Sequence, residues 1–290
     1  MTTFVEKAPA KINLTLEVLG QRTDGYHELQ SLVAFADVGD VVTLDISKPL
    51  GVTTSGPFGA SIAGANLVET ALRMLADANS RLRLGAVHLE KNLPVAAGIG
   101  GGSADAAAVL KLVRRANPEL ASDFDWHGIA KRLGADVPVC MESRLSWMTG
   151  LGEKVAPLKL PQKTSLYAVI ANPLQSVPPG KTAQVFRALR AAQLPMGGGG
   201  LPPNVRSDRE LAQIMASGRN ALQRAAAEVM PAISTMLNDL GSLPGARFAR
   251  MSGSGPTCFA IFETANVAET ARAKLAAARP EWWVVKTVLG

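Results

Sequence analysis

The sequence predicts a two-domain protein of the α+β class. Its 290 residues suggest about two domains if a domain takes roughly 100–200 residues. Apolar residues make up 47% and charged residues 19%, a balance that excludes a disordered chain. Strand patterns dominate roughly the first 60 residues, and both helical and strand patterns follow. We place the domain boundary near the end of a Gly- and Pro-containing stretch, which gives domains of residues 1–160 and 161–290.

Charge and hydropathy limit the partners and the compartment. The net charge of +6 favours an anionic partner. Basic residues are scattered and only 5% of residues are aromatic, so we expect a polyanionic metabolite and no nucleic acid. No apolar run approaches the roughly 20 residues of a membrane helix, and the first residues show no secretion signal. We therefore expect a cytoplasmic protein with no membrane partner, and we leave its oligomeric state open.

The N-terminal region is predicted to be built from strands. Residues 12–18 alternate between apolar and polar, which is the period of a half-buried strand, and Lys11 and Asn13 share its polar face. A turn is expected at Asp24-Gly25. Two further strands are predicted at residues 26–35 and 41–46, and a loop follows them at residues 48–61.

The middle of the chain alternates helices and strands. A helix over 67–78 and a strand over 86–89 precede a glycine-rich segment and a second helix over 104–115, for which Ser103 is the expected N-cap. A third helix is expected over 125–133, capped by Ser122 or Asp123 and ended by Gly134. Asp136 would then lie in the loop just beyond that helix.

The C-terminal half reads as mixed helices and strands. The predicted strands cover residues 166–171, 246–251, 257–262 and 282–288. The predicted helices cover residues 182–192, 208–217, 220–240, with a bend at Pro231, and 266–278. Residues 193–207 hold too little apolar content to pack, so we expect a mobile loop there.

The glycine-rich segment is a candidate phosphate cradle. Glycines at 98 and 100–102 directly precede a helix, so backbone N–H groups can approach an anion and the helix N-terminus adds donors and a favourable dipole. The segment is neither a Walker A loop nor the dinucleotide fingerprint, and Gly180-Lys181-Thr182 lacks the first glycine of a Walker A loop because position 175 is Gln. A tight strand-to-helix turn is the alternative. We favour phosphate binding.

Other candidate residues stay open on pattern alone. Lys11 and Asn13 either meet a phosphate or hydroxyl or form a solvated polar face, and the solvated face is favoured. Asp136 is either a general base or an Asx-turn residue, and the turn is favoured. The loop at 252–255 is either a hairpin turn or a second glycine lip over a ligand. Neither cysteine nor histidine spacing indicates a metal site, and Cys140 and Cys258 are expected to be buried core thiols.

Three ordered motifs resemble those of the GHMP small-molecule kinases. They are Pro9-Ala-Lys-Ile-Asn-Leu14, the segment from Pro94 to Asp105, and Met251-Ser-Gly-Ser-Gly-Pro256. The likeness runs from about residue 8 to residue 262. It implies an N-terminal domain like domain 2 of ribosomal protein S5 and a ferredoxin-like C-terminal domain.

Two more segments narrow the resemblance. Residues 20–27 and 133–138 are similar to those of family members that phosphorylate the 2-hydroxyl of 4-diphosphocytidyl-2-C-methyl-D-erythritol, a step of non-mevalonate isoprenoid synthesis. The implied partners are that alcohol and ATP, with Mg²⁺ held mainly by ATP phosphates and water. Two alternatives remain: a family member acting on another small alcohol, and a non-catalytic protein that binds a metabolite or RNA.

The resemblance also implies a role for individual residues. Asp136 would be the catalytic base and Lys11 its charged neighbour. Asn13 and His27 would hold the substrate, and Tyr26 and Phe186 would sandwich its cytosine ring. The implied ATP-binding residues are Asn66, Pro94, Val95, Ala96, Ala97, Gly98, Ile99, Gly100, Gly101, Gly102, Ser103 and Ala104.

Overall fold

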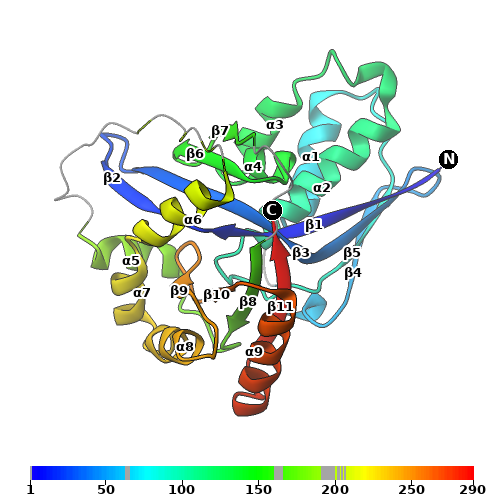
Figure 1. Ribbon diagram of the computed structural model, residues 1–290. Helices are drawn as coiled ribbons and strands as arrows, with labels where there is room; N and C mark the ends of the chain where they lie inside the picture. Colours follow the sequence, from blue (N-terminus) through cyan, green and yellow to red (C-terminus); the bar gives the residue numbers. More distant parts are fainter. Residues whose placement is uncertain are drawn as a thin grey trace. The chain divides into compact units, whose positions relative to one another are not determined.

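The computed structural model divides into two compact units, whose elements are labelled in Figure 1. It describes residues 2–62, 66–159, 166–190, 200, 203, 205 and 207–290. The first unit comprises Met1–Lys11, Val38–Val95 and Gly100–Ser143, and the second comprises Ile12–Asp37, Ala96–Ile99 and Arg144–Gly290. The predicted boundary at 160/161 and most of the predicted loop at 193–207 lie outside the described residues. Two long strands contribute to both units: β1 (Thr3–Asn13) and β3 (His27–Asp45).

The first unit is a small sheet packed with four helices. The second half of β3 pairs antiparallel with β5 (Ala86–Glu90), and β4 (Gly51–Ser55) pairs parallel with β5. Register sets buried apolar residues side by side, with Val42 opposite Leu89. The helices are α1 (Leu67–Ala78), α2 (Gly101–Ala116), α3 (Trp126–Leu133) and α4 (Val137–Glu142). In Figure 1 helices α1, α2 and α3 lie together, and each contacts the other two.

The second unit contains an antiparallel sheet with helices against it. The strand order is β11, β8, β10 and β9, with bounds Trp283–Leu289, Leu166–Asn172, Cys258–Phe262 and Phe248–Met251. Helix α8 (Ala232–Gly241) contacts β9 and β10, and α9 (Ala265–Ala278) contacts β8, β10 and β11. The remaining elements are β2 (Glu17–Gln21), β6 (Ser146–Gly150), β7 (Lys154–Pro157), α5 (Lys181–Ala188), α6 (Asp208–Ser217) and α7 (Gln223–Val229).

The strands differ from the prediction in their continuity. The expected strands at 26–35 and 41–46 form one strand, because Gly39 does not interrupt β3. A Cβ at Gly39 would lie 2.4 Å from the Ala8 carbonyl oxygen, so the glycine lets β1 approach closely. The alternation over 12–18 breaks between β1 and β2, and Lys11 and Asn13 are as buried as their apolar neighbours. The solvated polar face favoured from pattern alone is therefore wrong.

Helix starts and loops supply further corrections. Gly100, not Ser103, is the N-cap of α2, because its φ of +64° suits glycine. Asp125, rather than Ser122 or Asp123, caps α3 by accepting from the Gly128 amide. The predicted bent helix over 220–240 is two helices, α7 and α8, separated at Pro231, whose missing N–H breaks the helical ladder.

Several local predictions are confirmed. Helix α1 spans the predicted residues, with the Asn66 side chain accepting from the Val68 amide at 2.9 Å. Cys140 and Cys258 are buried free thiols. Strands β4, β6 and β7 were missed because they lie in stretches with turn signals. Among the described helices, none has the length and hydropathy needed to cross a membrane.

Candidate active site

The glycine-rich segment leads from the end of β5 to the first turn of α2. Its backbone takes positive φ at Ala96 (+54°), Gly98 (+77°) and Gly100 (+64°). Glycine enters this region without strain, which suits the last two positions. No side chain caps the start of α2. The N–H groups of a helix's first turn have no partner within the helix, so this start can bind an anion.

An ion pair lies beside this helix start within the first unit. Lys11 Nζ is 2.9 Å from Asp136 Oδ1, and their side chains are 4% and 35% exposed. Asp136 occupies the N-cap position of α4, yet its side chain makes no capping bond, so the carboxylate is free for other partners. A Cβ at Gly100 would lie 3.2 Å from Lys11 Cβ, so glycine at this position lets the segment approach the lysine. A fixed cation, a partly exposed carboxylate and a helix start therefore lie together.

A buried ion cluster anchors both ends of the glycine-rich segment. The Lys91 ammonium donates to Asp40 Oδ2 and, at 2.7 Å, to Asp105 Oδ2 in α2. Asp40 Oδ1 also accepts from the backbone N–H groups of Asn92 and Leu93, at 2.6 and 2.8 Å. The cluster thus joins β3, the chain entering the segment, and the helix leaving it. Sequence reasoning missed Asp40 and Lys91. Asp40 is a charge between apolar residues, but Lys91 lies between Glu90 and Asn92 and has no such local signal.

Two carboxylates share a single ammonium in this cluster. Burial raises the pKa of Asp105 to about 8, the Lys91 charge opposes the shift, and the Asp40 charge adds to it. Burial lowers the pKa of Lys91, but the two carboxylates outweigh it, so the net shift is upward. Asp105 Oδ1 has no hydrogen-bond partner among the described residues. Asp105 is therefore the member that holds a proton most readily.

This cluster predicts a pH-dependent stability. The pKa of Asp105 is raised above its ordinary 3.8 in the folded protein. Its protonation therefore contributes fully to the free energy of unfolding below pH 3.8, and this contribution is lost as the pH rises toward about 8. We expect the free energy of unfolding of the wild type, relative to Asp105→Asn, to fall between about pH 5 and pH 8 in urea melts. Asp123→Asn, at an exposed position, is the matched control for the chemistry of the substitution. A pH-independent difference for Asp105→Asn would contradict the prediction.

The second unit brings two of the predicted substrate residues together. The ring of His27, at the start of β3, stacks on Phe186 of α5 with centroids 4.3 Å apart and planes inclined by 15°. Burial lowers the pKa of His27, so the imidazole is neutral near pH 7 and offers one donor and one acceptor. Tyr26 is 63% exposed. Its ring is available for stacking.

Asn13 is buried with an unused acceptor. Its Nδ2 donates to Ser31 Oγ at 2.8 Å, and its backbone N–H donates to Ser252 Oγ at 3.1 Å. Asn13 Oδ1 has no hydrogen-bond partner in the described part of the chain. Because an unpaired buried oxygen costs free energy, this atom is a candidate acceptor for a ligand hydroxyl or amine.

The turn between β9 and β10 holds the middle of the glycine-rich segment. Ser252 Oγ donates to the Gly98 carbonyl at 3.2 Å, and the Thr257 N–H donates to the Ala97 carbonyl at 3.2 Å. A Cβ at Gly98 would lie 2.5 Å from the Gly255 carbonyl oxygen. The turn at 252–256 therefore fixes residues 96–99, in addition to joining the two strands.

The predicted residues fall into two groups, one in each unit. The first unit holds Lys11, Asn66, Pro94, Val95, residues 100–104 and Asp136. The second unit holds Asn13, Tyr26, His27, residues 96–99 and Phe186. Within the first unit, Leu67, the residue after Asn66, lies close to the segment, since a Cβ at Gly102 would lie 3.5 Å from its side chain.

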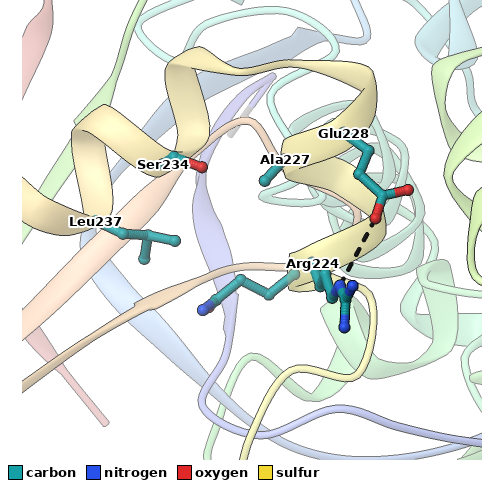
Figure 2. Close-up of a pocket in the computed structure, with 6 residues that line it drawn as sticks. Arg224, Ala227, Glu228, Ser234 and Leu237 are labelled. Carbon is teal, nitrogen blue, oxygen red and sulfur yellow. Dashed lines mark ion pairs between the residues drawn. The ribbon is translucent and has the colours of Figure 1, made fainter.

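A separate pocket of about 400 Å³ lies on helices α7 and α8 (Figure 2). Arg224 Nε and Glu228 Oε1 are 3.7 Å apart across one turn of α7, and both side chains are exposed. Ala227, Ser234 and Leu237 also line it. None of the predicted site residues lines this pocket, so we assign it no part in the chemistry.

Comparison with known proteins decides the family. Residues 66–144 match the model of the GHMP kinases N terminal domain, and residues 203–281 match that of the GHMP kinases C terminal. The 4-diphosphocytidyl-2-C-methyl-D-erythritol kinase of Rhodopseudomonas palustris strain BisB18 is 45% identical over 98% of this chain and 94% of its own. That of Methylobacterium radiotolerans is 47% identical over the whole of both chains. The chain belongs to the GHMP kinases, in the family of 4-diphosphocytidyl-2-C-methyl-D-erythritol kinases.

Solved structures agree with this GHMP kinase fold. A crystal structure of a 4-(cytidine 5'-diphospho)-2C-methyl-D-erythritol kinase matches with a TM-score of 0.76 and 31% identity over 99% of each chain. Homoserine kinase from Cytophaga hutchinsonii, 17% identical with a TM-score of 0.60, shares the fold. The predicted α+β fold class and family are confirmed. Membership of a kinase family implies that this GHMP kinase uses ATP.

Proposed function

We propose that the chain transfers the γ-phosphoryl group of ATP to the 2-hydroxyl of 4-diphosphocytidyl-2-C-methyl-D-erythritol. The products are the 2-phosphate and ADP, in non-mevalonate isoprenoid synthesis, and the expected compartment is the cytoplasm. The observation that carries the proposal is the Lys11–Asp136 pair, 2.9 Å apart, beside the uncapped start of α2.

Asp136 is proposed as the general base. Its carboxylate is partly exposed and makes no capping bond, so one oxygen can accept the proton of the substrate hydroxyl. Lys11 holds the other side of that carboxylate and places a positive charge near the transferred phosphoryl group. Phosphoryl transfer depends mainly on positioning and charge neutralisation, which these two residues supply together.

ATP is proposed to bind along residues 94–104, with Asn66 near the nucleotide. The glycine-rich backbone and the first turn of α2 supply N–H donors to the phosphates. Mg²⁺ would neutralise phosphate charge and be held mainly by phosphate oxygens and water, as it commonly is. The Asp136 carboxylate is a ligand of the kind that Mg²⁺ takes, but we assign it to accepting the proton.

The cytosine ring is proposed to lie against Phe186. The His27 imidazole already covers one face of the Phe186 ring, so a base that stacks on this face must take the place of the imidazole. His27 would then turn its neutral ring toward the donor and acceptor edge of the base. Tyr26, next to His27 in the chain, would cover the second face of the base. Asn13 Oδ1 is the proposed acceptor for another polar group of the substrate.

Tyr26→Ala should raise the KM for the cytidyl substrate about 10-fold or more, since stacking on an aromatic ring contributes roughly 1–3 kcal/mol per base. The KM for ATP should stay the same, because the phosphate segment does not include Tyr26. Tyr26→Phe keeps the ring and should keep both constants. If Tyr26→Ala raises both KM values equally, the residue supports the fold and does not bind the base.

His27→Ala should narrow the preference for cytidyl over uridyl analogues. The base edge would lose a hydrogen-bonding partner, and such partners supply discrimination between similar substrates. Competition kinetics with the two analogues measures the effect. An unchanged preference would mean that His27 does not form a hydrogen bond with the edge of the base.

A coupled ADP-release assay tests the proposal. The cytidyl alcohol is offered beside mevalonate, homoserine and galactose, each with ATP and Mg²⁺. We expect turnover of the cytidyl alcohol. Turnover of one of the others, with none of the cytidyl alcohol, would mean a GHMP kinase of different specificity. Salt-sensitive retention of RNA without ATP binding would favour the non-catalytic alternative instead.

A further inference from the structure

Lys181 is a buried cation in the second unit. It lies in the first turn of α5, is 6% exposed, and donates from Nζ to the Gly255 carbonyl oxygen. No carboxylate pairs with this ammonium within the described ranges, and burial alone lowers the pKa of Lys181, to about 8. Burying a charge without a counter-ion lowers the free energy of unfolding, so we look to the specific contact of Lys181 for a function.

The contact leads directly to the glycine-rich segment. Lys181 reaches the Gly255 carbonyl oxygen, against which Gly98 packs so closely that a Cβ there would lie 2.5 Å from the same atom. A second bond joins the same two elements, because Thr182 Oγ1 and Ser254 Oγ are 3.0 Å apart. Helix α5, the turn at 252–256 and residues 96–99 therefore form one continuous set of contacts.

Building on the proposed function, we propose that Lys181 is a positioning residue for ATP. Its hydrogen bond holds the Gly255 carbonyl in place, and residues 96–99 pack against this carbonyl in their positive-φ conformation. In this proposal the ammonium acts through the turn and not by direct contact with the phosphates or the substrate. Loss of the ammonium should therefore loosen the phosphate segment while removing an unfavourable buried charge.

Lys181→Met tests this, because methionine fills similar space without charge. We expect the KM for ATP to rise roughly 10-fold, the scale of a lost hydrogen bond to a charged group, and the KM for the cytidyl alcohol to change less than about 2-fold. The melting temperature should rise by a few degrees near pH 7. The folded-state pKa of Lys181 lies below the ordinary 10.5, so the penalty is relieved as the pH rises above about 8. The gain in melting temperature should therefore shrink near pH 9.5.

Nucleotide affinity separates this inference from the proposed function. Calorimetric titration with ADP reports on the phosphate segment without any alcohol, so it remains informative even if the cytidyl alcohol is not the substrate. Lys274→Met, at an exposed position of α9, is the matched control and should leave ADP affinity and melting temperature unchanged.

Two results would overturn the inference. One is a folded Lys181→Met protein with wild-type ADP affinity, which means that the ammonium does not position the segment. The other is a lower melting temperature with both KM values raised together, which means a general structural role. Should Lys181→Met not fold, Lys181→Leu, which also lacks a donor, undergoes the same measurements and is judged by the same outcomes.

Discussion

Asp136→Asn is expected to lower kcat by about 10²–10⁴ while the affinity for ATP stays within a few-fold. The amide has the same shape and its oxygen can still accept from Lys11, which lies 2.9 Å from Asp136 Oδ1. The amide cannot, however, take the proton of the substrate hydroxyl. Binding and chemistry should therefore separate in this variant. Steady-state kinetics gives kcat, and titration with ADP gives nucleotide affinity.

The matched control is Asp123→Asn, the same substitution at an exposed position in the first unit. It should leave kcat and ADP affinity unchanged. A near-normal kcat for Asp136→Asn would mean that Asp136 only orients the hydroxyl, or that the phosphates themselves receive the proton.

Gly98→Ala should lower kcat/KM for ATP by about 100-fold, the rate cost of displacing a positioning group by roughly 1 Å. Two effects combine at this position. The backbone has φ of +77°, which costs a residue with a Cβ about 1–3 kcal/mol, and the new Cβ would lie 2.5 Å from the Gly255 carbonyl oxygen. The clash is with backbone, so residues 96–99 or the turn at 252–256 must move. The measurement is kcat/KM for ATP together with ADP affinity.

Gly25→Ala separates the two effects. Gly25 also has positive φ, at +84°, but nothing lies within 4 Å of a Cβ built there. It should lose stability without a change in the KM for ATP. If Gly98→Ala folds and binds ATP as the wild type does, then residues 96–99 do not belong to the ATP site.

Local signals were enough where one segment determines its own structure. Helix α1 has the bounds that its apolar period predicts, and Asn66 caps it by a bond within the same turn. The glycine-rich segment could be recognised because glycines before a helix act through their own backbone. Local signals were not enough for the strands, because Lys11 and Asn13 are buried by elements far along the chain.

The supporting contacts of the site were beyond sequence reasoning for the same reason. Lys91 meets Asp40, 51 residues away in the sequence, and Lys181 meets Gly255, 74 residues away. Pattern reading treats each charge by its neighbours and predicts exposure. Only tertiary contacts show that these cations are buried and what they hold. The roles assigned to Lys11, Asp136 and the substrate residues rest on the family resemblance and remain predictions.

Identification of the product by ³¹P nuclear magnetic resonance tests the central claim most directly. The 2-carbon of the proposed alcohol bears a methyl group and no hydrogen, so a phosphate on its hydroxyl has no hydrogen on the attached carbon to split the signal. We predict a new phosphomonoester singlet, in step with ADP, when the chain is incubated with ATP, Mg²⁺ and 4-diphosphocytidyl-2-C-methyl-D-erythritol. A doublet or triplet would place the phosphate on a secondary or primary hydroxyl and contradict the account, as would ADP formation without any new phosphomonoester.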